Sequence, residues 1–584
     1  MANGAHSETA GRNPAAASGF LGGRMRFFDP MNLLWFALIA ILIFLVVSPL
    51  ARLFIVSFEE VGMKEGWTLS NYVTAYGRSR YVDALLNSLM LGGAVAAVST
   101  VLGVPLAWAL SRTDVPFKGL IWFVVLGAFI VPPYLGAIGW ILLAGPNSGW
   151  LNQVFMWIVG GEEGLVNVYS FEGLTLIIAL NSFPFVFLFT KAALDLISSE
   201  MEDAANILGA STWRTMWRVT LPLAWPAILA GFIIVFLETI ALFGSPALIA
   251  IPARFNVVTT QLWQFFEFPV KVEVAAAYAM PLLLITVALM FVQKLMLARK
   301  GFVSQTGKGG ERRLIKLGRW RWTMFGYCAF VGLISVALPM IVLIQASFSR
   351  AWGRGFAFDN LTLNNYVYLL FEHDMAWTSI QNTFIYGIGA ATFAGLLALA
   401  IAYIVSRNIT PVGNALAFLC MAPFVIPGIV LAIGFYAAYA APPLALYGSA
   451  TLMILAFTTR FLPIAYANSA AALRTIHPEM EEAVRILGGN RMTAIRRVIA
   501  PLIKKSLAGG WLLVFILATR ELSAAIFLVG PQTRTISVLL YDLSEEGNFE
   551  VLAALGGILL VITLAFVALG MRIAGRDFMM LKKD

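Results

Sequence analysis

The sequence predicts an all-α polytopic membrane protein with about twelve transmembrane helices, arranged as two tandem, parallel six-helix repeats. Three observations lead to this prediction. Of the 584 residues, 60% are hydrophobic and only 12% are charged, whereas about a quarter of the residues in a soluble domain are charged. Uncharged runs of about twenty residues, the length that crosses a bilayer as a helix, recur along the whole chain. Short motifs of the first half also return in the second half.

The apolar runs place six expected spans in each half of the chain. In the first half they fall near residues 33–55, 83–110, 118–143, 173–193, 223–245 and 277–297. In the second half they fall near residues 323–347, 379–404, 415–440, 449–470, 504–530 and 551–573. The expected domains are an N-terminal tail (1–30), a first transmembrane repeat (31–298), a basic linker (299–322), a second transmembrane repeat (323–573) and a C-terminal tail (574–584).

Basic residues gather in the linker and near both termini. Nine of them lie between Lys294 and Arg321, against the single acid Glu311. Because cytoplasmic loops of membrane proteins carry an excess of Lys and Arg, we expect the linker and both termini to be cytoplasmic. Orientation in a membrane therefore explains the net charge of +9, and we expect no nucleic-acid partner.

The motifs shared by the two halves indicate an internal repeat. The matched pairs are Thr68–Tyr72 with Thr362–Tyr366, Ser111-Arg112 with Ser406-Arg407, Phe129–Gly139 with Phe424–Gly434, and Met201–Gly209 with Met480–Gly488. The offset falls from 295 to 279 between the last two pairs, so the first half has about sixteen extra residues there. Since each half has an even number of spans, the two copies run in the same direction.

A polar segment with the same spacing follows the fourth span of each half. Acidic residues open it, where a helix dipole favours negative charge, and small residues keep one face narrow. A glycine then permits a reversal of the backbone, and a proline follows where the first turn of the next span tolerates it. We expect a stiff helix–turn–helix on the cytoplasmic surface, with apolar contacts from Ile207, Leu208, Ile486 and Leu487. Its residues are Glu202, Asp203, Ala204, Ala205, Gly209, Leu221 and Pro222 in the first half, and Glu481, Glu482, Ala483, Gly488 and Pro501 in the second.

This segment resembles the EAA coupling motif of the permeases of ATP-binding-cassette (ABC) importers: Glu-Ala-Ala, three residues, Gly, nine residues, then Ile-x-Leu-Pro. The first copy has Asp203 for the glutamate and Val219 for the isoleucine. The second copy has Val484 for the second alanine, Val498 for the isoleucine and Ala500 for the leucine, which leaves the relative weight of the two copies open. The resemblance implies that each loop docks into a groove on a separate ATPase subunit.

The resemblance covers nearly the whole chain, and the double-length form is most similar to the fused permeases of the iron(III) type. It implies a transport subunit that is not an enzyme and binds no cofactor itself, with ATP hydrolysed by two copies of a cytoplasmic ABC ATPase. It also implies a location in the bacterial inner membrane and a periplasmic binding protein that delivers ferric iron. An organic solute such as 2-aminoethylphosphonate, thiamine or a polyamine is the alternative cargo. An ion-gradient-driven secondary transporter is an alternative of another class, but it would not need two matched docking loops.

Four of the charged residues in the expected spans are candidate pathway residues, because charge inside a membrane is costly and often functional. Glu238 lies in the fifth span, Arg460 in the tenth, and Arg520 and Glu521 late in the eleventh. One interpretation is that they line or gate a transport pathway, with Arg460 paired to Glu521 or Glu238. The other is that they form a structural ion pair or lie at an interface.

Overall fold

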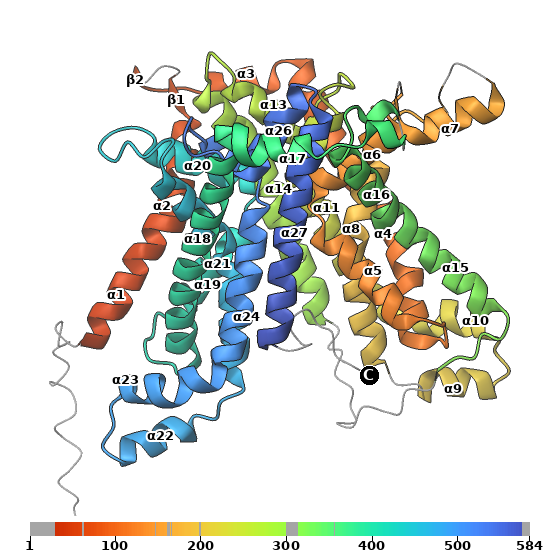
Figure 1. Ribbon diagram of the computed structural model, residues 1–584. Helices are drawn as coiled ribbons and strands as arrows, with labels where there is room; N and C mark the ends of the chain where they lie inside the picture. The colour runs from red at the N-terminus through yellow and green to blue at the C-terminus, as the bar shows by residue number, and fades with distance from the viewer. Residues whose placement is uncertain are drawn as a thin grey trace, which may run out of the picture.

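The protein is described by a computed structural model that covers residues 30–60, 64–146, 148–160, 164, 166–197, 200–299, 314–354 and 357–574. In these residues, ten helices are long and apolar enough to cross a membrane, and two bent helix pairs bring the number to as many as twelve. The expected fold class is therefore confirmed (Figure 1). The expected tails, apart from Pro30 and Ala574, and residues 300–313 of the linker lie outside the described residues.

The first repeat begins with a span that contains a π-helical stretch and ends with one long helix. Its elements are α1 (Pro30–Leu42), a π-helical stretch (Ile43–Val47), α2 (Ser48–Val56), β1 (Glu59–Glu60), β2 (Lys64–Trp67), α3 (Ser70–Tyr76), α4 (Ser79–Arg112), α5 (Lys118–Ile130), α6 (Pro133–Ala144), α7 (Trp150–Val159), α8 (Phe171–Leu196), α9 (Glu200–Ile207), α10 (Thr212–Thr215), a π-helical stretch (Met216–Thr220), α11 (Leu221–Ala241), α12 (Gly244–Ile249), α13 (Val258–Phe266) and α14 (Val272–Arg299). Helix α7 lies in the interval where the first half has its extra residues.

The second repeat has the same order of spans. Its elements are α15 (Trp320–Gly332), a π-helical stretch (Leu333–Ala337), α16 (Leu338–Ser347), two 3-10 turns (Trp352–Arg354 and Phe358–Asn360), α17 (Asn364–Val367), a π-helical stretch (Tyr368–Glu372), α18 (Asp374–Ser406), α19 (Gly413–Met421), a 3-10 turn (Ala422–Phe424), α20 (Gly428–Tyr439), α21 (Ala450–Arg474), α22 (Glu479–Ile486), α23 (Arg491–Ala494), a π-helical stretch (Ile495–Ile499), α24 (Ala500–Thr519), α25 (Ala525–Leu528), α26 (Ile536–Glu545) and α27 (Phe549–Ala574).

The third expected span of each repeat is a sharply bent helix pair. The sequence predicted single runs near 118–143 and 415–440, but α5 and α6 meet at 100°, and the helical segments Gly413–Phe424 and Gly428–Tyr439 meet at 110°. The bends follow from Pro132-Pro133 and Pro427, because a proline lacks the N–H that would continue the helix and disfavours helical backbone in the residue before it. These pairs do not run straight through the molecule.

The first span of each repeat packs against the bent pair of the other repeat. Helix α2 lies against α20, and α16 lies against α6. The contacts are close enough to require glycine: a Cβ on Gly139 would lie 2.9 Å from the Pro339 carbonyl oxygen, and one on Gly434 would lie 2.8 Å from that of Pro49. The repeated Ala-Ile-Gly motif is therefore explained by two symmetric helix crossings, since small residues let membrane helices approach closely.

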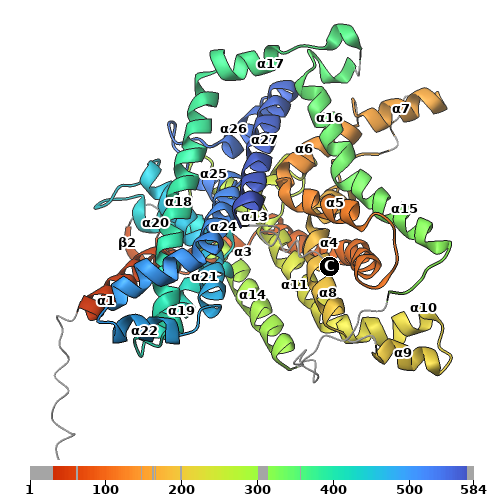
Figure 2. The ribbon, with the colours of Figure 1, turned by 60° about the horizontal axis from the view of Figure 1, so that its bottom comes forward.

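The molecule has two distinct ends, which we name the lower and the upper face. The lower face carries α9 and α22, together with the start of α1 and the ends of α14 and α27, and the upper face carries α7, α13 and α26 (Figure 1). Seen with the lower face forward, α9 and α22 lie at opposite sides of the molecule (Figure 2). The two loops that resemble the EAA motif therefore lie on one face and far apart.

Candidate coupling loops and membrane-embedded polar site

Each of the two polar loops is a short helix that ends in a left-handed glycine. Helices α9 and α22 have eight residues each, with three acidic residues in the first turn. Gly209 and Gly488 follow at φ +80° and +82°, with no atom within 4 Å of a Cβ built on either. Backbone conformation, not space, therefore requires glycine at both positions.

The hydrogen bonds after these glycines close the two helices in the same way. The amide of Ala210 donates to the Ala205 carbonyl at 3.0 Å, and that of Gly489 donates to the Val484 carbonyl at 2.9 Å. This bond from the second residue after a helix is typical of the Schellman motif, which satisfies carbonyls at a helix end. The expected helix–turn–helix is present in both repeats.

Glu202 anchors the first loop inside the protein. It is buried, and its Oε2 lies 3.5 Å from Nη1 of Arg112, at the end of α4. Thr220, in the π-helical stretch before α11, donates its hydroxyl to Glu202 Oε1 at 2.7 Å. Arg112 also donates to the carbonyls of Leu194 (2.6 Å) and Ile197 (2.7 Å) at the end of α8. The loop is therefore fixed to three spans by one carboxylate and one guanidinium.

Glu481 anchors the second loop by a matching contact. Its Oε1 accepts from Nε of Arg407 at 2.5 Å, and its Oε2 accepts from the Tyr403 hydroxyl at 3.0 Å. Arg407 directly follows α18 and also donates to the Ile476 carbonyl at 3.4 Å. Sequence reasoning missed Arg112 and Arg407 as anchor residues, although the repeated Ser-Arg pair at the end of each second span could have pointed to them.

The other predicted loop residues face outward or half outward. Asp203, Ala205 and Leu221 are half-buried, whereas Ala204, Pro222, Glu482, Ala483 and Pro501 are exposed. At the turns, Ile207, Leu208, Ile486 and Leu487 are 85%, 88%, 85% and 87% exposed. Each loop thus presents one apolar pair to its surroundings on the lower face, and exposed apolar surface of this kind is typical of a protein contact.

The fifth span of each repeat begins earlier than the sequence predicted. Helical backbone runs without a break over Thr212–Ala241 and Arg491–Thr519, so Pro222 and Pro501 lie inside the span and not at its start. A π-helical stretch directly precedes the helices that carry them. Proline cannot donate a hydrogen bond to the preceding turn, and the wider π turn accommodates this loss.

Two of the predicted pathway residues satisfy carbonyl groups at the bends. Arg520 donates from Nη1 to the carbonyls of Phe129 (2.9 Å) and Ile130 (3.0 Å), which belong to the bent pair of the other repeat. Arg460 donates from Nη1 to the Ile426 carbonyl at 2.8 Å. A broken helix leaves such carbonyls without partners, and burying them unpaired in a membrane costs several kcal/mol each. Both arginines therefore have a structural contact.

The first repeat uses an amide where the second uses Arg460. In the orientation in which its nitrogen faces acceptors, the Asn181 side chain donates to the carbonyls of Val131 (3.1 Å) and Ala128 (3.3 Å). Asn181 and Arg460 occupy matching positions in the fourth spans, and Val131 and Ile426 occupy matching positions at the bends. A side chain of the fourth span thus donates to the matching carbonyl at the bend in both repeats, from an amide in the first and from a guanidinium in the second.

Glu521 and Glu238 have different surroundings. Glu521 follows α24 and accepts from the Ala524 amide at 3.0 Å. Within the described chain, neither carboxylate lies within 4.0 Å of Arg460, so the expected ion pair is absent, because the arginine turns to the Ile426 carbonyl. Glu238 Oε2 is buried without a hydrogen-bond partner among the described residues. A cavity of about 190 Å³ adjoins Glu238, Arg460, Thr286, Met290, Phe185 and Phe424.

Comparison with known proteins finds similar chains of several kinds. Residues 98–301 and 394–574 match the family described as "Binding-protein-dependent transport system inner membrane component". The chain is 29% identical over 541 residues to the ferric transport system permease protein FbpB of Actinobacillus pleuropneumoniae, with 91% of this chain and 76% of that protein covered. It is 29% identical over 511 residues to the putative ferric transport system permease protein FbpB 1 of Haemophilus influenzae, with 86% and 78% covered.

Among solved structures, one similar chain comes from a bacterial alginate ABC transporter in complex with an alginate pentasaccharide-bound periplasmic protein. It is 19% identical, has a TM-score of 0.38, and the match covers 48% of this chain and 96% of that chain.

The two segments that match the family lie one in each repeat. The first runs from within α4 to the end of α14, and the second runs from within α18 to the end of α27. Each includes one of the two anchored loops, and together they make up well over half of the chain. The chain belongs to the family of binding-protein-dependent transport system inner membrane components.

Proposed function

We propose that this chain is the permease subunit of an ABC importer for ferric iron, which a periplasmic binding protein delivers. In this proposal the lower face is cytoplasmic, both termini lie on that side, and ATP is hydrolysed by two copies of a separate ABC ATPase. The chain itself forms the path through the membrane and catalyses no reaction.

The pair of matched loops is the observation that carries this proposal. Both loops have the same helix, the same glycine turn and the same exposed apolar pair, and they lie on one face at opposite sides (Figure 2). A soluble partner that docks on both must be present twice or be two-fold symmetric. The anchors Arg112–Glu202 and Arg407–Glu481 would carry a movement of that partner directly into the spans.

The cargo is proposed from the two ferric transport permease proteins, which are similar to this chain over most of its length. Glu238 is the proposed pathway residue, because it lines the cavity of about 190 Å³ and one of its carboxylate oxygens has no partner in the described chain. For Arg460, Arg520 and Glu521 we propose that holding the bends and helix ends is the main role, with any effect on the pathway exerted through that backbone.

Uptake of radiolabelled ferric iron into proteoliposomes tests the proposal. The vesicles would contain this chain, the ATPase that co-purifies with it and the binding protein. We expect ATP-dependent uptake that is lost when both apolar pairs are replaced, in Ile207→Ser with Leu208→Ser and Ile486→Ser with Leu487→Ser. Trp157→Ser is the matched control, because Trp157 is 85% exposed on α7 at the upper face. Uptake that needs no ATPase would falsify the proposal, and ATP-dependent transport without iron uptake would overturn the cargo.

A further inference from the structure

The second span of each repeat is held by polar contacts at both of its ends. At the lower face, Arg112 at the end of α4 and Arg407 directly after α18 hold the glutamates of the two loops, as described above. At the upper face, the same two helices hold α13 and α26, the short helices that precede the last span of each repeat. A single helix therefore joins the two faces in each repeat.

In the first repeat, the upper contact is made by adjacent residues of α4. Ser88 is buried, and its Oγ accepts from the Val258 amide, the first residue of α13, at 2.7 Å. Asn87 donates from Nδ2 to the Asn256 carbonyl at 3.0 Å. An N–H in the first turn of a helix has no partner within the helix, so Ser88 supplies the missing acceptor and fixes α13 to α4.

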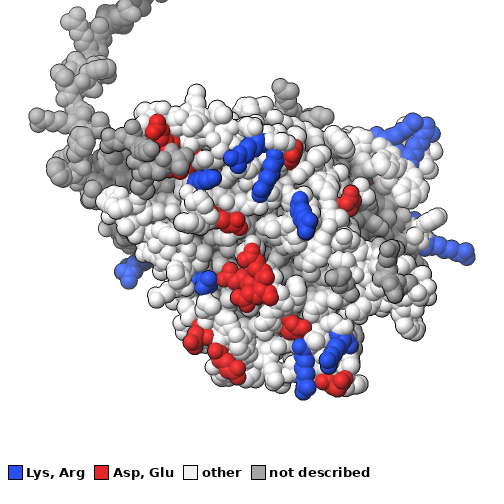
Figure 3. Space-filling view, turned by 90° about the horizontal axis from the view of Figure 1, so that it is seen from above, with Lys and Arg blue, Asp and Glu red and all other residues white. Residues whose placement is uncertain are grey.

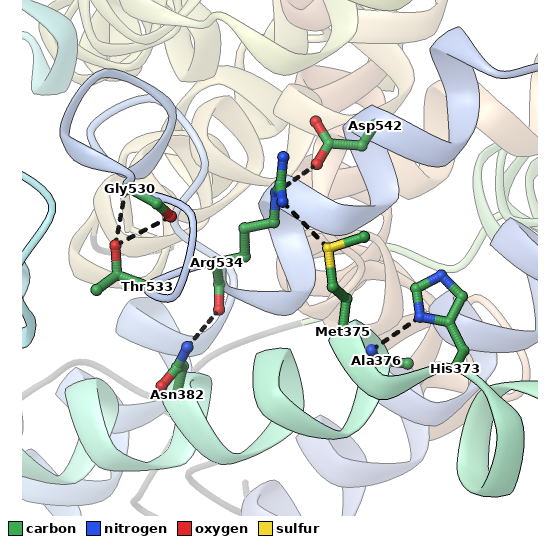
Figure 4. Close-up of polar contacts among 8 residues, drawn as sticks. All are labelled: His373, Met375, Ala376, Asn382, Gly530, Thr533, Arg534 and Asp542. Atoms are coloured by element: carbon green, nitrogen blue, oxygen red, sulfur yellow. Dashed lines mark hydrogen bonds and ion pairs between the residues drawn. The ribbon is translucent and has the colours of Figure 1, made fainter.

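In the second repeat, the matching residues of α18 make the same contacts, and the one from Asn382 to the Arg534 carbonyl is drawn in Figure 4. Thr383 Oγ1 accepts from the Ile536 amide, the first residue of α26, at 2.9 Å. Asn382 donates to the carbonyls of Gln532 (2.8 Å) and Arg534 (3.0 Å). The Arg534 side chain then reaches Asp542 in α26, with Nε 3.0 Å from Oδ2. The loop and the helix behind it are therefore held to α18 together.

The distance between the two ends is the same in both repeats. Ser88 and Arg112 are 24 residues apart, and so are Thr383 and Arg407. At 1.5 Å per residue this corresponds to about 36 Å of helix. The Asn-Ser and Asn-Thr pairs are not part of the loop motif, so the loop resemblance does not imply them. The presence of such a pair at the same spacing in both repeats is independent support for treating each second span and the elements at its two ends as one rigid unit.

The helices held in this way meet in the middle of the upper face. The Trp263 ring of α13 lies 6.3 Å from the Tyr541 ring of α26 and 5.6 Å from that of Phe527. Acidic side chains gather near the middle of this face (Figure 3). Partial burial and the nearby Glu545 carboxylate raise the pKa of Glu267, just after α13. Packed aromatic rings thus hold together two helix ends whose carboxylates repel each other.

We propose that α4 and α18 are transmission rods, each moving its coupling loop and its upper helix as one body. Asn87, Ser88, Asn382 and Thr383 are positioning residues that latch the upper ends. When the loops move toward each other at the lower face, the rods separate α13 and α26 and open the upper face. This inference rests on the proposed function, because it needs a partner that moves the loops.

Paired spin labels at Phe268→Cys and Glu546→Cys would follow the separation of the two upper helices. Phe268 is 97% exposed and Glu546 is exposed, whereas the native Cys328 and Cys420 are buried. In the complex with the co-purified ATPase, trapping with ATP and vanadate should widen the distance between the labels. In Ser88→Ala with Thr383→Ala we expect no widening, and iron uptake about tenfold lower from two lost hydrogen bonds, while ATPase co-purification and basal hydrolysis persist.

Two further sets of variants make this test decisive. Ser88→Thr with Thr383→Ser keeps both acceptors, with the residue found in the other repeat, and should restore widening and uptake. Thr100→Ala and Thr378→Ala remove hydroxyls that donate to the Ala96 and Asp374 carbonyls of their own helices, and should change neither the distance nor the uptake. If the distance between the labels widens normally and uptake is normal in Ser88→Ala with Thr383→Ala, the proposal that α4 and α18 act as transmission rods is overturned. A wild-type chain that neither binds an ATPase nor takes up iron would instead overturn the proposed function.

Discussion

The two loops proposed to couple to an ATPase are built alike but are tied to the membrane helices differently. In the first loop, Glu202 contacts Arg112 of the second span and Thr220 in the π-helical stretch of the fifth. In the second loop, both partners of Glu481, Arg407 and Tyr403, come from the second span. The glutamate of the first loop thus contacts spans before and after the loop. The glutamate of the second loop contacts only the end of a span before it, among these partners. Both loops share the Arg–Glu ion pair. They differ in the third partner, the hydroxyl group that also donates to the glutamate, which is Thr220 in the first loop and Tyr403 in the second.

The comparison also explains how the second loop departs from the motif. It has Val484 where the first loop has Ala205, and it has Gly489 where the first loop has Ala210. A Cβ on Gly489 would lie 2.6 Å from Cγ1 of Val484. The larger side chain before the turn therefore requires the smaller residue after it, and the two loops are different solutions for the same turn.

Removing the anchoring carboxylates should give the largest effect and should separate the two loops. Loss of one partner of a buried ion pair costs about 3–5 kcal/mol. Arg112 is 3% exposed and Arg407 is 13% exposed, so we expect Glu202→Ala to lower the midpoint of thermal unfolding more than Glu481→Ala. Glu479→Ala, at an exposed position of α22, is the control. Equal losses in the two loops would contradict the difference in anchoring.

Removing the third partner should sharpen the comparison. A hydrogen bond to a charged group is worth about 1.5–3 kcal/mol, so Thr220→Val and Tyr403→Phe should each lower the thermal midpoint. Only Thr220→Val also cuts a tie to the fifth span. We therefore expect it to reduce the stimulation of ATP hydrolysis by the loaded binding protein, with Tyr403→Phe close to wild type in that assay. The reverse order would refute the assignment.

Exchanging the turn residues tests whether Val484 and Gly489 compensate each other. Gly489→Ala alone overpacks the turn against Val484 and should cost about 1–3 kcal/mol. Val484→Ala with Gly489→Ala recreates the pair of the first loop and should recover most of the thermal midpoint. Ala210→Gly in the first loop, where no large side chain must be avoided, is the control. A double variant no better than Gly489→Ala would rule out the compensation.

The smallest effect should be the same in both loops. Gly209 and Gly488 have φ near +80° and open space around a Cβ, so Gly→Ala costs only the left-handed conformation, about 1–2 kcal/mol. Asn replacements should lose less, because Asn tolerates this region better. Affinity for the ATPase measures the outcome. A loss confined to one loop would show that the two turns are not equivalent.

The sequence predicted the parts of the fold that depend on local signals. Apolar runs gave the spans, and the repeated glycine gave both left-handed turns. The bends at Pro132-Pro133 and Pro427 were visible as prolines, but a proline does not set an angle of 100° or 110°. The packing of each first span against the other repeat was not predictable. Surfaces that face lipid and surfaces that face other helices have similar apolar composition.

The polar site shows the same limit. The sequence marked Arg460, Arg520 and Glu238 as charged residues in spans, but it did not show their partners. Arg520 reaches Phe129 and Ile130, which lie almost 400 residues earlier in the chain. The Arg112–Glu202 contact was closer to prediction, since both residues belong to repeated motifs. Repetition marked the two residues separately, and only the fold shows that they form a pair.

The packing of each first span against the other repeat has a consequence for synthesis. Helix α2 is complete at Val56, whereas its partner α20 begins only at Gly428. At about 5–20 residues per second, roughly 20–70 seconds pass between the two, during which the first span lies in the bilayer without its final neighbour. Met31–Leu50 carries no charged residue, so lipid alone can solvate this segment while it waits. The fused chain then guarantees that the missing half arrives on the same ribosome, next to the helix that needs it.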